Sequence, residues 1–345
     1  MNPLNIVIAM SIPGDSPQAH QTASRIAEAL GLPREDIRVG IAIESDQPRT
    51  GFNSFLMGLK NQYAAVAVWD KYTNDAVLAE WAKQKNAVWP VYDEFSYGAF
   101  QNKALIVADA GDFTAVVRLD PGTTPPRNLE KLIFELLDKL NGGVFVVSSQ
   151  YDGRLALRSD FMPSGRLEEY YNLIQEYTGI DPRFGKQVTA GAALTILVAG
   201  PPAPVFRGLK IWASDDGFYT LAFGLTRATV LPDLQIAGPR VVSRSESGYP
   251  LDPNAYAGRL ANAVLLREAL AGSSRIHARS KAAEFLRLLA KTAPGKVIAN
   301  SVGLRDDLVF EGYANWRFLC DEWSAARRDM VKIIHNLPSS EACLL

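Results

Sequence analysis

Short apolar runs alternate with segments of helical spacing along the N-terminal part of the chain. The runs have strand length, and their continuous apolar character is typical of strands buried on both faces of a parallel sheet. We expect strands at residues 5–12, 37–43, 64–69, 87–92 and 115–119. We expect helices between them, at residues 17–30, 55–60, 75–85 and 99–108. Strands that alternate with helices predict right-handed βαβ units and a mostly parallel sheet flanked by helices.

The alternation continues more loosely after residue 128 and then gives way to helices. The pattern predicts a helix at 129–140, a strand at 144–149, a helix at 167–177, an apolar element at 188–199 and a late strand with a loop over 231–242. Helical spacing then dominates at residues 256–270, 280–291 and 312–334. We therefore expect a single large α/β domain with helical C-terminal additions.

The composition is that of an ordinary globular protein. The chain has 345 residues, of which 48% are hydrophobic and 21% charged, so disorder is not expected. A net charge of −1 predicts no nucleic-acid partner. The cysteines, Cys320 and Cys343, form neither a disulfide framework nor a metal-ligand spacing, which favours a reducing compartment. The N-terminal apolar run lacks a basic flank and is interpreted as a strand rather than a signal peptide, so we expect a cytoplasmic protein.

Polar residues follow several of the expected strands. Ser11 ends the first, Glu44 and Asp46 end the second, and Asp120 ends the strand within "GDFTAVVRLDPGTTPP". In parallel sheets, ligands bind beyond the carboxyl ends of the strands, so these residues are candidates for one site. The alternative is that each of them serves a turn.

Three pieces of sequence, in this order, resemble one known family. "YGAFQNKALIVADAGDFTAVVRLDPGTTPPRNLEKLI" is similar to a helix around "ARN" followed by "GDYVxFLDxDxxPxPxxLE". "SDDGFYTLAFG" is similar to a later Glu/Asp-Asp element, and "LPDLQIA" to the strand after it. Over roughly residues 5–242 the chain thus resembles the nucleotide-sugar-dependent glycosyltransferases of the GT-A fold, especially those of the family-2 type.

The resemblance implies a fold, a domain division and an activity. The fold would be a GT-A-like, Rossmann-like catalytic domain over residues 1–245, with a nucleotide-binding half at 1–126, an acceptor half at 127–245 and a helical extension at 246–345. The activity would be transfer of a sugar from a nucleoside-diphosphate-sugar donor to a hydroxyl of a glycan, a lipid-linked or a small-molecule acceptor. Two alternatives remain: a nucleotidyltransferase that makes sugar nucleotides, and a non-catalytic binding protein on the same fold.

The leaving diphosphate needs positive charge near it. In the family, an Asp-x-Asp at the strand tip binds a divalent metal, Mn²⁺ or Mg²⁺. Here the motif is Asp120-Pro121-Gly122, so Asp120 alone would be the protein's metal ligand, and one carboxylate makes a poor dedicated site. Arg240 and Arg244 are the alternative cations for the diphosphate, unless they belong to a solvated loop.

An acceptor hydroxyl also needs a base. The resemblance assigns this role to Asp216, with Asp215 beside it. Two adjacent carboxylates can raise one another's pKa when they are partly desolvated. The same Ser-Asp-Asp-Gly stretch is also typical of a helix N-cap, and the cap does not exclude catalysis.

Donor contacts are carried over residue by residue. Ser11 and Pro13 match the end of the first strand in the family, and Glu44 and Asp46 match acids that meet uracil or ribose. Gln101 stands where the family commonly has arginine, and Asn102 is retained; a turn or buried hydrogen bonding would also explain these polar residues. Arg118, unusual in a central strand, is expected to point toward a carboxylate or phosphate.

Other chemistries lack their motifs. The sequence has no GxxxxGK[ST], no GxGxxG after the first strand, no GxSxG and no HExxH. The amphipathic segment 280–290 has basic flanks, which suits either a peripheral membrane contact or ordinary packing.

Overall fold

The structure of the protein is a computed structural model. It describes residues 4–12, 17–45, 53–84, 89, 97–140, 143–151, 167–180, 193–206, 209, 216–224, 226–236, 253–292 and 303–338. Several expectations fall outside these residues: Pro13, Asp46, Asp215, Arg240, Arg244 and most of the strand expected at 87–92.

One sheet of seven strands organises the described residues. Its strands are β1 (Asn5–Ile12), β2 (Arg38–Ser45), β3 (Ala65–Trp69), β4 (Ala115–Arg118), β5 (Val146–Tyr151), β6 (Leu194–Leu197) and β7 (Ala228–Ile236), in the order β3-β2-β1-β4-β6-β5-β7. All strand pairs are parallel except those of β6, which runs antiparallel to both β4 and β5. Pro232 within β7 is tolerated because β7 is an edge strand and its pairing is irregular there.

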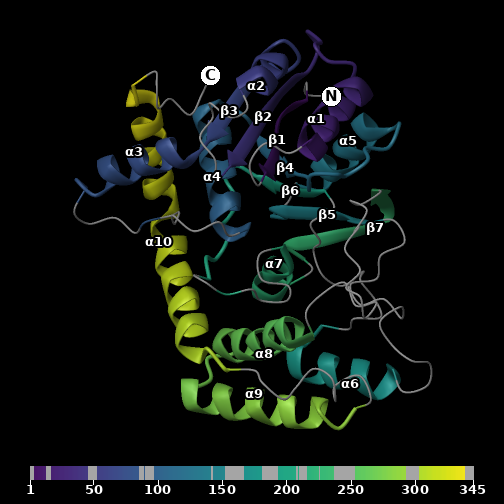
Figure 1. The fold of residues 1–345 in the computed structure, drawn as a ribbon, viewed down its shortest axis with the longest axis vertical. Helices are drawn as coiled ribbons and strands as arrows, with labels where there is room; N and C mark the ends of the chain where they lie inside the picture. The colour runs from purple at the N-terminus through teal and green to yellow at the C-terminus, as the bar shows by residue number, and fades with distance from the viewer. Residues whose placement is uncertain are drawn as a thin grey trace.

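Helices cover both faces of this sheet (Figure 1). One face packs against α1 (Pro17–Leu30), α2 (Asn53–Lys60) and α5 (Leu129–Lys139). The other packs against α3 (Lys71–Trp81), α4 (Tyr97–Ala110) and the C-terminal half of α10 (Asp306–Asn336). The mostly parallel α/β fold predicted from the sequence is therefore confirmed.

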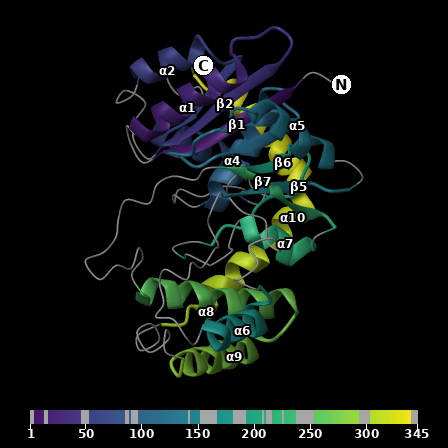
Figure 2. The same cartoon turned by 90° about the vertical axis from the view of Figure 1, so that its right-hand side faces the viewer.

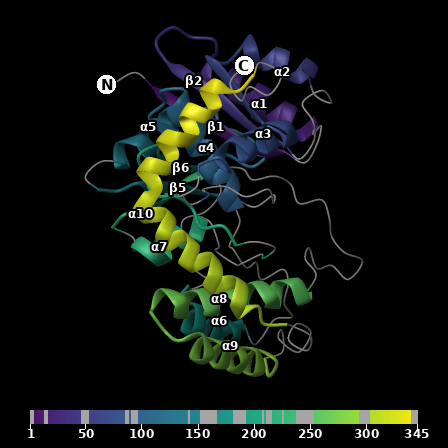
Figure 3. The same cartoon turned by 90° about the vertical axis from the view of Figure 1, so that its left-hand side faces the viewer.

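A helical layer lies at the other end of the molecule (Figures 1 and 2). It consists of α6 (Leu167–Thr178), α8 (Pro253–Leu270) and α9 (Arg275–Leu289), which share a hydrophobic cluster with Phe218 of α7 (Asp216–Phe223). The long helix α10 starts in this layer and runs back along the sheet (Figure 3). None of the helices in the described part of the chain has the length and hydropathy needed to cross a membrane.

Two helices hold the segment 198–206, which follows β6. On α10, the indole N–H groups of Trp316 and Trp323 donate to the carbonyls of Pro202 (2.9 Å) and Gly200 (2.8 Å). On α4, Asn102 donates to the carbonyl of Ala203 and accepts its N–H, at 3.1 and 2.8 Å. These bonds satisfy buried backbone groups that no sheet partner reaches, so this segment has little freedom to move.

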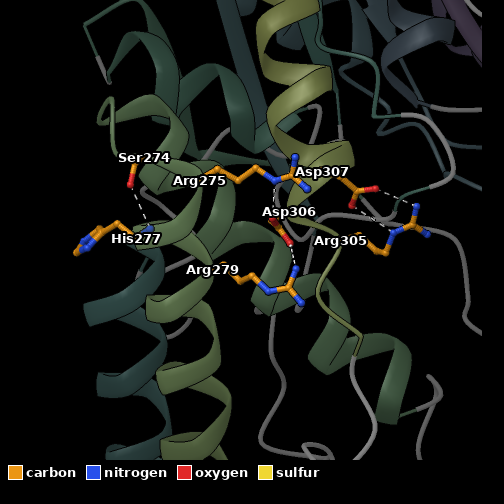
Figure 4. Close-up of polar contacts among 7 residues, drawn as sticks. All are labelled: Ser274, Arg275, His277, Arg279, Arg305, Asp306 and Asp307. Carbon is orange, nitrogen blue, oxygen red and sulfur yellow. Dashed lines mark hydrogen bonds and ion pairs between the residues drawn. The ribbon is translucent and has the colours of Figure 1, made fainter.

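Asp306 joins α9 to α10 (Figure 4). Its carboxylate, 4% exposed, accepts hydrogen bonds from Arg275 at 2.5 Å and Arg279 at 2.7 Å. Burial opposes ionisation, but the Arg275 hydrogen bond and the positive charge of Arg279 outweigh it and hold the pKa of Asp306 below its usual value. The neighbouring Asp307 is 46% exposed and contacts Arg305 only at 3.4 Å.

Asp306→Asn should therefore destabilise the protein in a pH-dependent way. Because the pKa is lower in the folded than in the unfolded state, Asp306 stabilises the fold at neutral pH, and this contribution is lost as the pH falls through the folded-state pKa. The arginines are partly exposed, so we expect a loss of about 1–2 kcal/mol at pH 7. Urea unfolding at pH 7 and pH 3 measures it, and the difference between wild type and variant should shrink at pH 3. Asp307→Asn is the matched control, with a much smaller expected change because the pair that Asp307 forms is exposed; an equal loss in both variants would contradict the role of burial.

Candidate functional site at the carboxyl edge of the sheet

The chain reverses its direction of travel across the sheet between β1 and β4. From β1 it proceeds to β2 and β3 on one side, and then returns to place β4 on the other side of β1. In α/β sheets, the crevice beyond the carboxyl ends of the strands at such a reversal is where ligands bind. The carboxyl ends of β1, β2 and β4 are therefore the candidate site.

Register places the expected polar residues side by side at this edge. Ser11 of β1 pairs with Glu44 of β2, and Ala9 pairs with Arg118 of β4. Side chains that oppose one another in neighbouring strands share a face, and so do residues two apart, so Ser11, Glu44 and Arg118 lie on the α4 side of the sheet. Asp120 lies two residues after Arg118, beyond the end of the strand. The register agrees with the expectation that Ser11, Glu44 and Asp120 follow strands at one edge of the sheet; that they form one site stays a prediction.

A buried ion pair lies within this edge. The ammonium group of Lys103, on α4, donates to Oε1 of Glu44 at 2.6 Å, and the Ser11 hydroxyl donates to Oε2 at 3.3 Å. The side chains of Lys103 and Glu44 are 6% and 3% exposed. Lys103 also lies 5.7 Å from the ring centroid of Trp69. Sequence reasoning missed Lys103, although a lysine within the apolar helix "AFQNKALIVA" signals a buried partner.

Helix α4 runs antiparallel to the strands, with its first turns at the carboxyl edge. Lys103 reaches the end of β2, whereas Gly111 and Asp112, which follow α4, bond to residues at the start of β1 and β2. Gln101, in the second turn, is fully buried, and neither heteroatom of its amide has a hydrogen-bond partner within the described part of the chain. Buried amides of this kind are normally satisfied, so this one indicates a water or a ligand.

The loop after β4 has a fixed conformation. The N–H of Gly122 donates to Oγ1 of Thr22, on α1, at 2.8 Å, and the Thr22 hydroxyl faces the carbonyl of Thr123 at 3.4 Å. Gly122 has φ = 85°, a conformation that favours glycine. This backbone explains why the position of the second acid in the family motif holds glycine here. It leaves Asp120, half-buried, as the acid of this loop.

The described residues fit a metal only in a limited way. They contain no group of three or more His, Cys, Asp or Glu residues that could hold an ion. Asp120 could supply one oxygen ligand, and Glu44 already accepts from Lys103 and Ser11. Magnesium-type sites often use one or two carboxylates together with substrate phosphates. The residues therefore fit a metal that arrives with a diphosphate and do not fit a resident one.

The remaining site residues are only partly described. Asn102 is buried and holds Ala203, so in this structure it acts on the backbone; its contact with a ligand stays a prediction. Asp216 is the first residue of α7, as expected for a helix start, and only its backbone is described. Its place relative to Asp120, and the roles of Asp215, Arg240 and Arg244, also stay predictions.

Comparison with known proteins gives only distant similarities. No family model and no curated protein matches the chain. Among solved structures, it is similar to the mannosyltransferase PcManGT from Pyrobaculum calidifontis in complex with GDP-Man and Mn²⁺ (13% identity, 95% of this chain and 85% of the other, TM-score 0.43). It is also similar to glucosyl-3-phosphoglycerate synthase from Mycobacterium tuberculosis in complex with Mn²⁺, UDP and phosphoglyceric acid (13% identity, 79% of this chain and 80% of the other, TM-score 0.43). A third similar structure is TarS 1-349 from S. aureus (13% identity, 96% of this chain and 89% of the other, TM-score 0.45). With TM-scores below 0.5, these similarities alone assign neither family nor activity.

Proposed function

We propose that the protein is a glycosyltransferase that moves a sugar from a nucleoside-diphosphate-sugar donor to an acceptor hydroxyl. The observation that carries the proposal is the grouping of Ser11, Glu44, Arg118 and Asp120 at the carboxyl ends of adjacent strands, where the strand order reverses. This is where a nucleotide is expected to bind in an α/β sheet, and the order of the sequence pieces that resemble GT-A glycosyltransferases supports a donor site at the same residues.

The proposed role of each residue follows from the chemistry of its side chain. Ser11, Glu44 and Gln101 supply hydrogen-bonding groups for the base and ribose. Arg118, buried on the α4 face, supplies positive charge close to Asp120. A divalent cation, Mn²⁺ or Mg²⁺, would be held by Asp120 and the donor and would stabilise the leaving diphosphate.

Asp216 is the proposed base that takes the proton of the acceptor hydroxyl as the bond from the sugar to the diphosphate breaks. Asp216 is the first residue of α7, and Phe218 of this helix packs into the hydrophobic cluster of the helical layer. Residues 1–126 would bind the donor, and 127–245 the acceptor. Because α6 packs against α8 and α9, the extension 246–345 would support the acceptor half. The acceptor would be a glycan, a lipid-linked or a small molecule, and the low cysteine content favours cytoplasmic action.

Thermal shift with UDP, GDP, ADP and dTDP and their sugars, each with and without Mn²⁺, tests the proposal. We expect one nucleotide series to raise the Tm, because a ligand that binds only the folded state stabilises it. If none of these nucleotides raises the Tm, the proposal is refuted. Binding without transfer or donor hydrolysis would instead favour the non-catalytic binding protein.

The metal should bind only together with the nucleotide. The described residues contain no group of three or more His, Cys, Asp or Glu residues that could hold an ion. We therefore expect weak Mn²⁺ binding to the protein alone and a gain of about 10-fold or more when the diphosphate is present. Reciprocity requires the same gain in nucleotide affinity from Mn²⁺. Calorimetric titration in both orders measures it, and tight Mn²⁺ binding to the nucleotide-free protein would contradict the single-carboxylate site.

A further inference from the structure

We propose that Trp316 of α10 is a positioning residue: it holds α7, the helix that begins with the proposed base Asp216, in the place that sugar transfer requires. The inference rests on the proposed function and adds to it a residue of the C-terminal extension, which the resemblance leaves outside the catalytic domain. It predicts that the extension contributes to the rate of the chemical step and not only to stability.

Three aromatic side chains hold α7 between two hydrophobic clusters. Phe218 belongs to the cluster of the helical layer and Tyr219 to the cluster between the sheet, α4 and α10, while the partly buried Phe223 packs against both. Phe218 and Tyr219 are fully buried and are the second and third residues after Asp216. A helix of eight residues has little stability of its own, so these contacts decide where it begins.

The ring of Trp316 lies against two of these three side chains. Its centroid is 4.7 Å from that of Phe218 and 5.8 Å from that of Phe223, with interplanar angles of 82° and 64°. Edge-to-face pairs at such separations are favourable and prefer a defined geometry. Since Phe218 and Phe223 lie near opposite ends of α7, Trp316 restricts the rotation of this helix as well as its position.

Trp316 is itself tied to the segment that precedes α7. Its indole N–H donates to the carbonyl of Pro202 at 2.9 Å. The segment 198–206 is also bound to α4, because Asn102 exchanges two hydrogen bonds with the backbone of Ala203. One side chain thus contacts α7 and a segment that is fixed to α4, the helix whose first turns border the proposed donor site.

Gly312 allows α10 to approach this segment closely. A Cβ atom at Gly312 would lie 2.7 Å from the ring of Phe206 and 3.1 Å from the carbonyl oxygen of Val205. The ring of Phe206 in turn lies edge-on to that of Phe218, with 6.5 Å between the centroids. About one turn before Trp316, α10 therefore has no room for a side chain, and the position of α7 depends on this close packing.

Trp323 offers a comparison within the same helix. It is 4% exposed against 8% for Trp316, and its indole N–H donates to the carbonyl of Gly200 at 2.8 Å. None of the ring contacts among the described residues joins Trp323 to α7. The two tryptophans thus share their burial, their type of hydrogen bond and the segment that they hold, and they differ in their contact with α7.

Steady-state hydrolysis of the donor, with water as the acceptor, tests the role of Trp316. The probe is the UDP-, GDP-, ADP- or dTDP-sugar that gives the largest rise in Tm. Trp316→Leu should lower kcat by about 10- to 100-fold, the scale expected when a catalytic group is slightly misplaced, while the Kd of the nucleotide changes little. Trp323→Leu should lower the Tm by a similar amount and keep kcat near the wild-type value.

A double-mutant cycle with Asp216→Asn separates positioning from stability. If Trp316 acts through Asp216, Trp316→Leu should have almost no further effect on kcat in the Asp216→Asn background, because residues that act as a unit are not additive. A merely structural role would reduce activity by the same factor in both backgrounds. Trp316→Phe keeps a ring against α7, so it should fold and lose less kcat, and it passes through the same cycle if the leucine variant does not fold.

The outcomes separate this inference from the proposed function. Equal losses of kcat in the Trp316 and Trp323 variants, an unchanged kcat in Trp316→Leu, or an additive cycle would refute the role of Trp316 while the glycosyltransferase stands. Full activity in Asp216→Asn would refute the base and its positioning together and leave donor binding intact. If the wild type neither binds nor hydrolyses any nucleotide sugar, the proposed function and this inference are both refuted.

Discussion

Asp120→Asn should abolish most sugar transfer while it leaves the fold intact. The substitution keeps the size of the side chain and removes its charge, and Asp120 is half-buried beyond the end of β4 rather than packed in the core. If Asp120 helps to stabilise the leaving diphosphate, the loss appears chiefly in the transition state, so kcat should fall by about 100-fold or more. Donor hydrolysis or transfer, with the nucleotide series identified by thermal shift, measures the effect.

The metal response distinguishes this role from a general loss of activity. In Asp120→Asn, the gain in nucleotide affinity that Mn²⁺ gives the wild type should fall toward 1, while binding of the nucleotide without metal should change little. Asp75→Asn, on an exposed acid of α3, is the matched control and should behave as the wild type. Full activity in Asp120→Asn would remove this residue from the site, and loss of activity with an unchanged Mn²⁺ response would remove it from metal binding.

The fold could be predicted because its strands are buried on both faces. Continuous runs such as "NIVIAMSI" and "IRVGIAI" have little other explanation in a globular chain, and the alternation with helices restricts the topology. The antiparallel direction of β6 could not be predicted, because its burial pattern is that of any central strand. The helix expected from residue 75 begins at Lys71, since Asp70 caps it by accepting the N–H of Thr73 at 2.8 Å.

The candidate residues at the strand ends could be identified from a local pattern, whereas Lys103 of α4 could not. Ser11, Glu44 and Asp120 are each the polar residue that ends an apolar run, so a local pattern reveals them. Lys103 pairs with Glu44 across 59 positions of sequence, and no local pattern names that partner. The consecutive Gln101, Asn102 and Lys103 are all buried, but their contacts differ. The amide of Gln101 has no hydrogen-bond partner within the described residues, Asn102 bonds to the backbone of Ala203, and Lys103 forms the ion pair with Glu44.

Gly98→Ala should strongly destabilise the protein and distort the start of α4. A Cβ atom at Gly98 would lie 1.9 Å from the carbonyl oxygen of Pro204, well inside contact distance. The opposing atom is backbone and cannot rotate away, and the segment around Pro204 is held by Asn102 and Trp316. We therefore expect a loss of about 3 kcal/mol or more in the free energy of unfolding, measured by urea unfolding.

Gly58→Ala is the matched control with the opposite sign. Gly58 lies in α2 and is exposed, and a Cβ there would meet no atom within 4 Å. Alanine lowers the conformational entropy of the unfolded chain and favours the helix, so this variant should gain about 0.5–1 kcal/mol. If Gly98→Ala also folds with little loss, the segment 198–206 can retreat from α4. The close packing of that segment against the first turn of α4 would then no longer explain how Gln101 and Lys103 are held at the edge of the site.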